Sequence, residues 1–466
     1  MIPETTICAL ATSGHGAIAL IRVSGSDTYP IVEKIFKPVA PGKDLGAQPP
    51  YTIHLGTILD GKRVIDEVMV SLFRAPHSYT GEDAIEISCH ASPYIEQKIL
   101  ELLIRHGAEP AKPGEFTQRA FLNGKMDLSQ AEAVADLIAA ESEGAHKVAL
   151  QQLRGGFSDQ LKKLRDQLLQ FISMIELELD FSEEDVEFAS RDQLGNLVEE
   201  IGSLIEDLLE SFQLGNALKK GVPVAIVGRP NVGKSTQLNA LLQEDRAIVS
   251  HIEGTTRDTI EDTVNLEGIK FRFIDTAGIR ETAEPIENLG IRRTYQKIEQ
   301  SSIVLLLVEA SDGSRLIQRS LDEIRKQVEN QGKQVILVLN KSDRITPAQF
   351  REVESSMLLL QNERMISLSA ERLENIDGLI SLLLDLVSMG SIRHQDVIIS
   401  NIRHYNALKS ASESLSRVSE GLTSSLPSDL LAQDIREVLH YLGEITGEVT
   451  TDEILGNIFK NFCIGK

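Results

Sequence analysis

The residues best suited to chemistry form a glycine-rich stretch near the middle of the chain, GRPNVGKS at positions 228–235. The stretch follows an apolar run and satisfies the pattern G-x-x-x-x-G-K-[ST], in which glycines let backbone N–H groups converge on phosphate oxygens. A helix that starts within it adds the positive end of its dipole. Lys234 should then reach the β and γ phosphates, and Ser235 should ligate Mg²⁺. We predict contacts with a nucleotide from Asn231, Val232, Gly233, Lys234, Ser235 and Thr236.

The sequence NKSD, which begins at Asn340 after a second apolar run, predicts a pocket for the base. The Asp343 carboxylate can accept from the N1–H and N2–H₂ donors of guanine, Asn340 can meet N7, and the stem of Lys341 can cover the ring. Adenine presents an acceptor where Asp343 needs a donor, so we expect specificity for guanine. Ser369 and Ala370, after a further apolar run, are expected to complete the pocket.

Two segments between these motifs are expected to sense the nucleotide. In GTTRD, at positions 254–258, Thr256 should close on Mg²⁺ and the γ phosphate. In DTAG, at positions 275–278, Asp275 should hold Mg²⁺ through water and the Gly278 N–H should sense the γ phosphate. Each motif alone could be a polar turn, but their joint order favours a guanine-nucleotide switch. The predicted GTP contacts from this part of the chain are Ser250, Thr255, Thr256, Asp275, Thr276, Ala277 and Gly278.

The residue after this DTAG motif is Ile279, where many such proteins carry the glutamine that positions the attacking water. An aliphatic side chain neither donates nor accepts a hydrogen bond, so another group must orient the water. Arg257 and Arg280 are two candidates for electrostatic catalysis. Either of them could also be a surface arginine.

Length and composition bound the kind of protein. The 466 residues predict about three domains, and 42% hydrophobic with 25% charged residues is ordinary for a globular protein. A formal net charge of -22 argues against indiscriminate nucleic-acid binding, so any RNA contact should depend on a partner. Three separated cysteines and no convincing signal peptide predict a reduced, cytoplasmic protein. The apolar runs are too short to span a bilayer, so we expect no membrane partner.

The residue pattern changes three times along the chain and thereby predicts the domains. Short β-like runs with one helix, at 94–106, indicate an α+β domain over residues 1–120. Amphipathic helices follow over 121–218, where apolar residues recur at three and four spacing, as in Leu161, Leu164, Leu168 and Phe171. Strands alternating with helices over 219–389 indicate a doubly wound α/β domain. Helices return over 390–466, too few to bury a core alone, so we expect them to pack on the earlier helical segment. The α/β domain would then be inserted in a helical domain.

Three stretches of the chain together resemble the bacterial tRNA-modification GTPase family MnmE, also called TrmE. The first is PGEFTQRAFLNGK at 113–125 with DLSQAE after it, the second is the inserted GTPase pattern with GTTRD, and the third is the ending FCIGK. The resemblance implies an N-terminal folate-binding and dimerisation domain, a helical-bundle domain made of two chain segments, and an inserted Ras-like P-loop G domain. It also implies a homodimer whose G domains meet across their nucleotide faces.

The activity that this resemblance implies is the modification of tRNA. With an FAD-dependent MnmG-like partner in a heterotetramer, the family adds an aminomethyl or carboxymethylaminomethyl group to C5 of the wobble uridine of certain tRNAs. The one-carbon unit comes from a tetrahydrofolate derivative, 5-formyl- or 5,10-methylene-tetrahydrofolate. The alternative is a GTPase switch in ribosome assembly, or a scaffold, without folate chemistry.

Residue roles follow from the same resemblance. Glu287 is implied as the catalytic group that orients water through a bridging water, although by its position alone it could be a solvated helix residue. Charge stabilisation is implied to come from K⁺, with Asn231, Ser250, Ile252 and Thr255 as its ligands. The implied folate contacts are Arg22, Glu86, Lys125 and Lys466. Cys463 could be a functional thiol near the folate or a small buried hydrophobe, and the resemblance does not decide between them.

Overall fold

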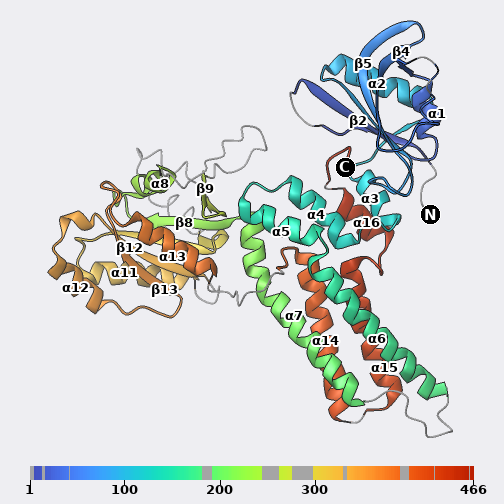
Figure 1. The fold of residues 1–466 in the computed structure, drawn as a ribbon. Helices are drawn as coiled ribbons and strands as arrows, with labels where there is room; N and C mark the ends of the chain where they lie inside the picture. The colour runs from blue at the N-terminus through green and yellow to red at the C-terminus, as the bar shows by residue number, and fades with distance from the viewer. Residues whose placement is uncertain are drawn as a thin grey trace. The chain divides into compact units, whose positions relative to one another are not determined.

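The computed structural model shown in Figure 1 divides into two compact units. Unit 1 comprises Met1–Ala139, Leu150–Val198 and Ser410–Lys466, and unit 2 comprises Ala140–Ala149 and Glu199–Lys409. The structure describes residues 5–12, 16–40, 42, 44–180, 191–243, 262–274, 298–328, 333–388, 398–424, 426–460 and 462–466. Within these residues, no helix combines the length and the apolar character needed to cross a membrane.

Unit 1 contains a seven-stranded sheet with the order β3-β4-β5-β6-β2-β1-β7. Its strand pairs are antiparallel except for the parallel pair β1 and β7. In β5, Val68, Val70 and Leu72 are buried, because alternate side chains of a strand face the same side. The strands are β1 Ile7–Leu10, β2 Ile18–Ser24, β3 Phe36–Pro38, β4 Ile53–Asp60, β5 Arg63–Phe73, β6 Ala84–His90 and β7 Glu109–Pro110.

Two helices, α1 (Thr28–Glu33) and α2 (Pro93–Arg105), cover one face of this sheet. Proline at the first position suits α2, because that position has no N–H partner within the helix. The helix predicted at 94–106 is therefore confirmed. On the opposite face, Ile53 and Leu55 of β4 and Met69 of β5 are 66%, 58% and 47% exposed, whereas Ile7 and Ala9 of β1 are buried against Phe116.

The remaining described helices of unit 1 include segments from both ends of the chain. In Figure 1, α6 (Gly156–Asp180) lies alongside α15 (Ser428–Thr446), and the two are in contact. The predicted packing of the C-terminal tail on the earlier helices is thus confirmed. The other helices with residues in this unit are α3 Glu115–Leu122, α4 Leu128–Ile138, α5 Glu143–Leu153, α7 Arg191–Lys220, α14 Ile402–Thr423 and α16 Asp452–Phe459.

The inward stripe of α6 differs in one position from the predicted stripe. Leu161, Leu164 and Leu168 are buried as the three-and-four spacing predicts. The next buried side chain is Ile172, four residues after Leu168, whereas Phe171 is only half-buried. The helix therefore continues its stripe by a step of four rather than three.

Unit 2 contains a six-stranded sheet with the order β13-β12-β11-β8-β10-β9, parallel except for the β9–β10 hairpin. Helices cover both faces, which explains why β11 and β12 are apolar along almost their whole length. This is the doubly wound α/β fold predicted for the middle of the chain. The elements are β8 Val222–Gly228, α8 Lys234–Gln243, β9 Asp262–Leu266, β10 Ile269–Phe273, β11 Ile303–Glu309, α11 Ser314–Val328, β12 Gln334–Asn340, the 3₁₀ turn η1 Ser342–Arg344, α12 Pro347–Ser356, β13 Glu363–Ser367 and α13 Ile376–Ser388.

Candidate functional site

The predicted phosphate loop joins the carboxyl end of β8 to the first residue of α8. Gly233 has φ +98°, and a Cβ at this position would collide with the Asn340 side chain, so only glycine fits. The Lys234 ammonium donates to the carbonyl oxygens of Gly228 at 3.0 Å and Arg229 at 2.9 Å. Ser235 is exposed at the start of α8, where its hydroxyl fits the role of a Mg²⁺ ligand.

A single buried amide connects this loop to the predicted base pocket. Asn340, at the end of β12, is 2% exposed, and its Nδ2 donates to the Val232 carbonyl at 2.8 Å. Its Oδ1 accepts from the backbone N–H groups of Lys341 at 2.8 Å and Ala370 at 3.1 Å. The amide has one further N–H hydrogen, which is the group available for guanine N7. Asn340 thus holds three segments in register.

The carboxylate predicted to read guanine has a pKa below its ordinary value. The Ser369 hydroxyl donates to Asp343 Oδ1 at 2.8 Å, and this hydrogen bond lowers the pKa of the Asp343 carboxyl, with Arg372 contributing to the same effect. The Arg372 Nε atom lies 3.5 Å from Asp343 Oδ2. An ionised carboxylate only accepts hydrogen bonds, which matches the donor edge of guanine. The structure therefore brings Asn340, Asp343, Ser369 and Ala370 together.

Lys341 bridges the two halves of the site. Its backbone has φ +59°, in the left-handed region that residues other than glycine rarely adopt. Its ammonium donates to the Asn231 carbonyl at 2.8 Å and forms an ion pair with the Glu309 carboxylate. Glu309 belongs to none of the nucleotide-binding motifs in the sequence. Its signal would have been an acidic residue at the end of β11, which the parallel register places beside Asn340.

The remaining predicted residues of the GTP and cation sites cannot be located in the structure. They fall outside the described residues, so their roles stay predictions. These residues are Ser250, Ile252, Thr255, Thr256, Arg257, Asp275, Thr276, Ala277, Gly278, Arg280 and Glu287.

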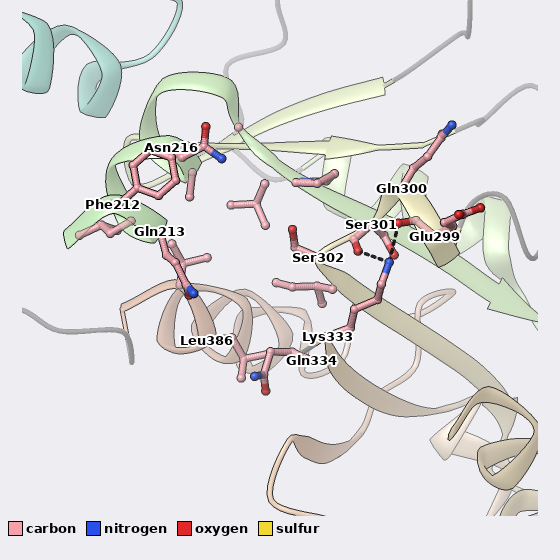
Figure 2. Close-up of a pocket in the computed structure, with 17 residues that line it drawn as sticks. Phe212, Gln213, Asn216, Glu299, Gln300, Ser301, Ser302, Lys333, Gln334 and Leu386 are labelled. Carbon is pink, nitrogen blue, oxygen red and sulfur yellow. Dashed lines mark hydrogen bonds between the residues drawn. The ribbon is translucent and has the colours of Figure 1, made fainter. Parts of the chain in front are cut away.

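A cavity of about 640 Å³ in unit 2 lies at the opposite edge of the sheet, where β8, β11 and β12 begin. Figure 2 shows Lys333 turned toward Ser301 and Glu299 within it. The Lys333 ammonium donates to the carbonyls of Ile298, Glu299 at 2.6 Å and Ser301 at 2.9 Å. Burial lowers the pKa of this lysine. Since nucleotides bind at the carboxyl ends of parallel strands, this cavity is distinct from the predicted GTP site.

A second cluster lies in unit 1 around Arg22 of β2. Its Nη2 donates to Glu86 Oε1 at 2.7 Å, and its Nη1 donates to the Gly465 carbonyl at 3.3 Å. The guanidinium carbon lies 5.3 Å from the centroid of the Tyr79 ring and 5.6 Å from that of Phe116. Two of the predicted folate residues, Arg22 and Glu86, are thus paired, and the Arg22 guanidinium also lies near two aromatic rings and contacts the C-terminal segment.

The C-terminal residues are held against the N-terminal domain by close backbone contacts. Gly465 has φ +90°, and a Cβ there would overlap the Leu10 carbonyl oxygen. Lys466 follows Gly465, whose carbonyl accepts from Arg22. Among the described residues, the Lys466 side chain itself forms no hydrogen bond or ion pair. The Lys125 ammonium donates to the Pro76 carbonyl at 3.0 Å, in the loop that carries Tyr79.

The three cysteines differ in environment. Cys8 and Cys89 are buried, and burial raises the pKa of each thiol to about 11. Cys463 is exposed, while its backbone carbonyl accepts from the Gly114 N–H at 3.3 Å. The alternative that Cys463 is a small buried hydrophobe is therefore wrong.

Two known families match consecutive parts of the chain. Residues 128–463 match the family described as MnmE helical domain, and residues 6–125 match the one described as GTP-binding protein TrmE N-terminus. The tRNA modification GTPase MnmE of Bacteroides thetaiotaomicron is 54% identical over 465 residues, covering 99% of this chain and 100% of that relative. The protein of the same name from Christiangramia forsetii is 53% identical over 471 residues, covering 99% of each chain.

Among solved structures, a variant of Aquifex aeolicus Era bound to GDP and AlF4⁻ is similar to part of the chain. It is 28% identical and covers 41% of this chain and 65% of its own, with a TM-score of 0.27.

Proposed function

The chain belongs to the MnmE (TrmE) family, and from this premise we propose that it hydrolyses GTP in the modification of tRNA. The observation that carries the proposal is the buried Asn340 amide, which joins the phosphate loop to the pocket predicted to read guanine. This hydrogen-bonded connection suits a protein that must bind the base and the phosphates of one nucleotide at the same time. We expect it to act in the cytoplasm.

The chain's own residues account for binding and orientation of the substrate. Lys234 would turn from the loop carbonyls that it contacts to the β and γ phosphates, and the Ser235 hydroxyl would hold Mg²⁺. Asp343, whose carboxylate accepts a hydrogen bond from the Ser369 hydroxyl, would accept from guanine. The bound Mg²⁺ supplies Lewis-acid stabilisation of the phosphate charge.

Hydrolysis needs a group to orient water, because Ile279 cannot do so. We assign this role to Glu287 and treat Arg257 and Arg280 as rivals. Asn231, whose side chain is exposed in the phosphate loop, is an oxygen donor that fits a monovalent cation. When bound, K⁺ would supply the charge stabilisation that an arginine finger gives elsewhere, about 10³ to 10⁵ in rate.

The Arg22 cluster supports folate binding. A pterin has an amide and amino edge like that of guanine, which suits the Glu86 carboxylate, while cations such as Lys125 and Lys466 suit the carboxylate tail. Tetrahydrofolate would supply the one-carbon unit for C5 of the wobble uridine. The C-terminal segment would complete this site, because Gly465 already contacts Arg22.

Two partners are part of the proposal. The exposed apolar part of the unit 1 sheet, at Ile53, Leu55 and Met69 of β4 and β5, suits a second copy of the chain, because apolar surfaces of this kind are commonly buried in homodimers. A formal charge of -22 suits an arrangement in which an FAD-dependent MnmG-like partner holds much of the tRNA.

Calorimetry with 5-formyltetrahydrofolate tests the folate assignment and separates it from a scaffold GTPase. The full chain should bind the folate. Arg22→Ala should weaken binding by roughly tenfold or more, because the guanidinium that forms charged hydrogen bonds in the proposed folate site is lost. Arg105→Ala, which removes an exposed ion pair with Asp60 in the same unit, is the matched control and should bind normally. A wild-type chain that releases no heat with the folate would support the scaffold instead.

A further inference from the structure

Glu309 occupies a position between the two halves of the GTP site. It is the last residue of β11, and the parallel register places it directly beside Asn340 of β12. Its side chain is 27% exposed, and its carboxylate forms an ion pair with the Lys341 ammonium. The chain therefore places an acidic group near a pocket that must accept phosphates, which calls for a physical reason.

The geometry of Lys341 provides that reason. Lys341 and Asn231 both have positive φ, +59° and +65°, and the Lys341 ammonium donates to the Asn231 carbonyl at 2.8 Å. Two residues in a sparsely populated backbone region persist only where their surroundings hold them. Glu309 supplies the second contact that fixes the ammonium, so the methylene stem of Lys341 has a defined direction.

We propose that Glu309 is a positioning residue for guanine-nucleotide binding. By holding the Lys341 ammonium at the Asn231 carbonyl, it sets the lysine stem where it covers the base and ties the base pocket to the phosphate loop. The proposal rests on the GTP-binding function proposed above. It requires neither folate, nor tRNA, nor potassium.

A simpler electrostatic view predicts the opposite sign. Removing a negative charge near the phosphates should strengthen nucleotide binding through Coulomb attraction. Removing a positioning group should weaken nucleotide binding. Without Glu309 the Lys341 side chain is free to change rotamer before binding, so the entropy cost of ordering it falls on the binding step. A plain surface ion pair would change neither binding nor stability by much. Nucleotide affinity after loss of the Glu309 charge should therefore rise in the electrostatic view, fall if Glu309 is a positioning residue, and stay the same for a plain surface ion pair.

The test is binding of a fluorescent methylanthraniloyl-GDP to the full chain and to Glu309→Gln. We expect the dissociation constant of the variant to rise roughly tenfold, mostly through faster dissociation. Glu309→Asp keeps the charge on a shorter side chain and should recover part of the affinity. Glu323→Gln removes an exposed ion pair with Arg319 on α11 of the same unit and should bind as the wild type does.

A double-mutant cycle with Lys341→Met shows whether Glu309 acts through Lys341. Each single change breaks the same contact, the ion pair between Glu309 and Lys341. Glu309→Gln should therefore cause little further loss of nucleotide affinity in the Lys341→Met background. Equal or tighter binding by Glu309→Gln, or full additivity of the two changes, would overturn the assignment. A wild-type chain unable to bind the probe would overturn the GTP function itself, and the assignment with it.

Discussion

At the scale of single residues, Asn340 and Asp343 have different roles in the predicted base pocket. Asn340 is buried and mainly holds backbone segments together, whereas Asp343 presents a carboxylate whose pKa the Ser369 hydroxyl lowers. Asn340 thus supports the architecture of the pocket, and we expect Asp343 to determine its specificity. A substitution at Asp343 should therefore change which nucleotide binds rather than whether the domain folds.

Asp343→Asn tests this division. An amide in place of the carboxylate loses the acceptor for guanine N2–H₂ but can donate to the C2 oxygen of xanthine. We expect GTP affinity to fall on the order of 10²-fold or more and xanthosine triphosphate to become the preferred nucleotide. Competition binding against labelled GDP measures both effects, with Asp322→Asn, which alters an ion pair on α11, as the control. An unchanged preference for GTP would remove Asp343 from base recognition.

At the scale of elements, the β9–β10 hairpin is fixed by the start of α5. The Gly144 N–H donates to the Gly268 carbonyl at 3.0 Å, and Lys270 of β10 forms an ion pair with Glu141. In sequence, this hairpin joins the two segments predicted to sense the nucleotide, at 254–258 and 275–278. The turn of this hairpin packs closely against the start of α5.

Gly144→Ala should destabilise unit 2. A Cβ at Gly144 would lie 2.7 Å from both the Gly268 carbonyl oxygen and Leu218 Cδ2, and the backbone oxygen cannot move aside cheaply. We expect a loss of about 1 to 3 kcal/mol. At Gly195, within α7, a Cβ meets nothing within 4 Å, so Gly195→Ala should stabilise by about 0.5 to 1 kcal/mol. Thermal unfolding midpoints should shift in opposite directions, and a stable Gly144→Ala would refute the tight contact.

The contrast between local and distant contacts explains what the sequence could predict. The strands β11 and β12 follow from apolar runs, and the placing of Asn340 at the end of β12 follows from a short motif, because neighbours along the chain determine both. Glu309 could not be found in this way, since its place beside Asn340 depends on strand register. The contact of Gly465 with Arg22 joins opposite ends of the chain, and only the family resemblance pointed toward it.

At the scale of the whole molecule, the chain combines a nucleotide site in unit 2 with the Arg22 cluster in unit 1. The domain limits 1–120, 121–218, 219–389 and 390–466 stay predictions. The match to the MnmE helical domain runs from residue 128 to 463 and so encloses the α/β segment, as an insertion would require. We propose that Glu287 and K⁺ act when two G domains meet, because the aliphatic Ile279 side chain cannot orient water.

Turnover of GTP by the full chain in KCl and in NaCl, at rising protein concentrations, tests this claim most directly. We predict that turnover per molecule is at least tenfold faster in KCl, on the order of the smaller arginine-finger effects, and that it rises with protein concentration as copies associate. Equal turnover in the two salts at every concentration would contradict the account.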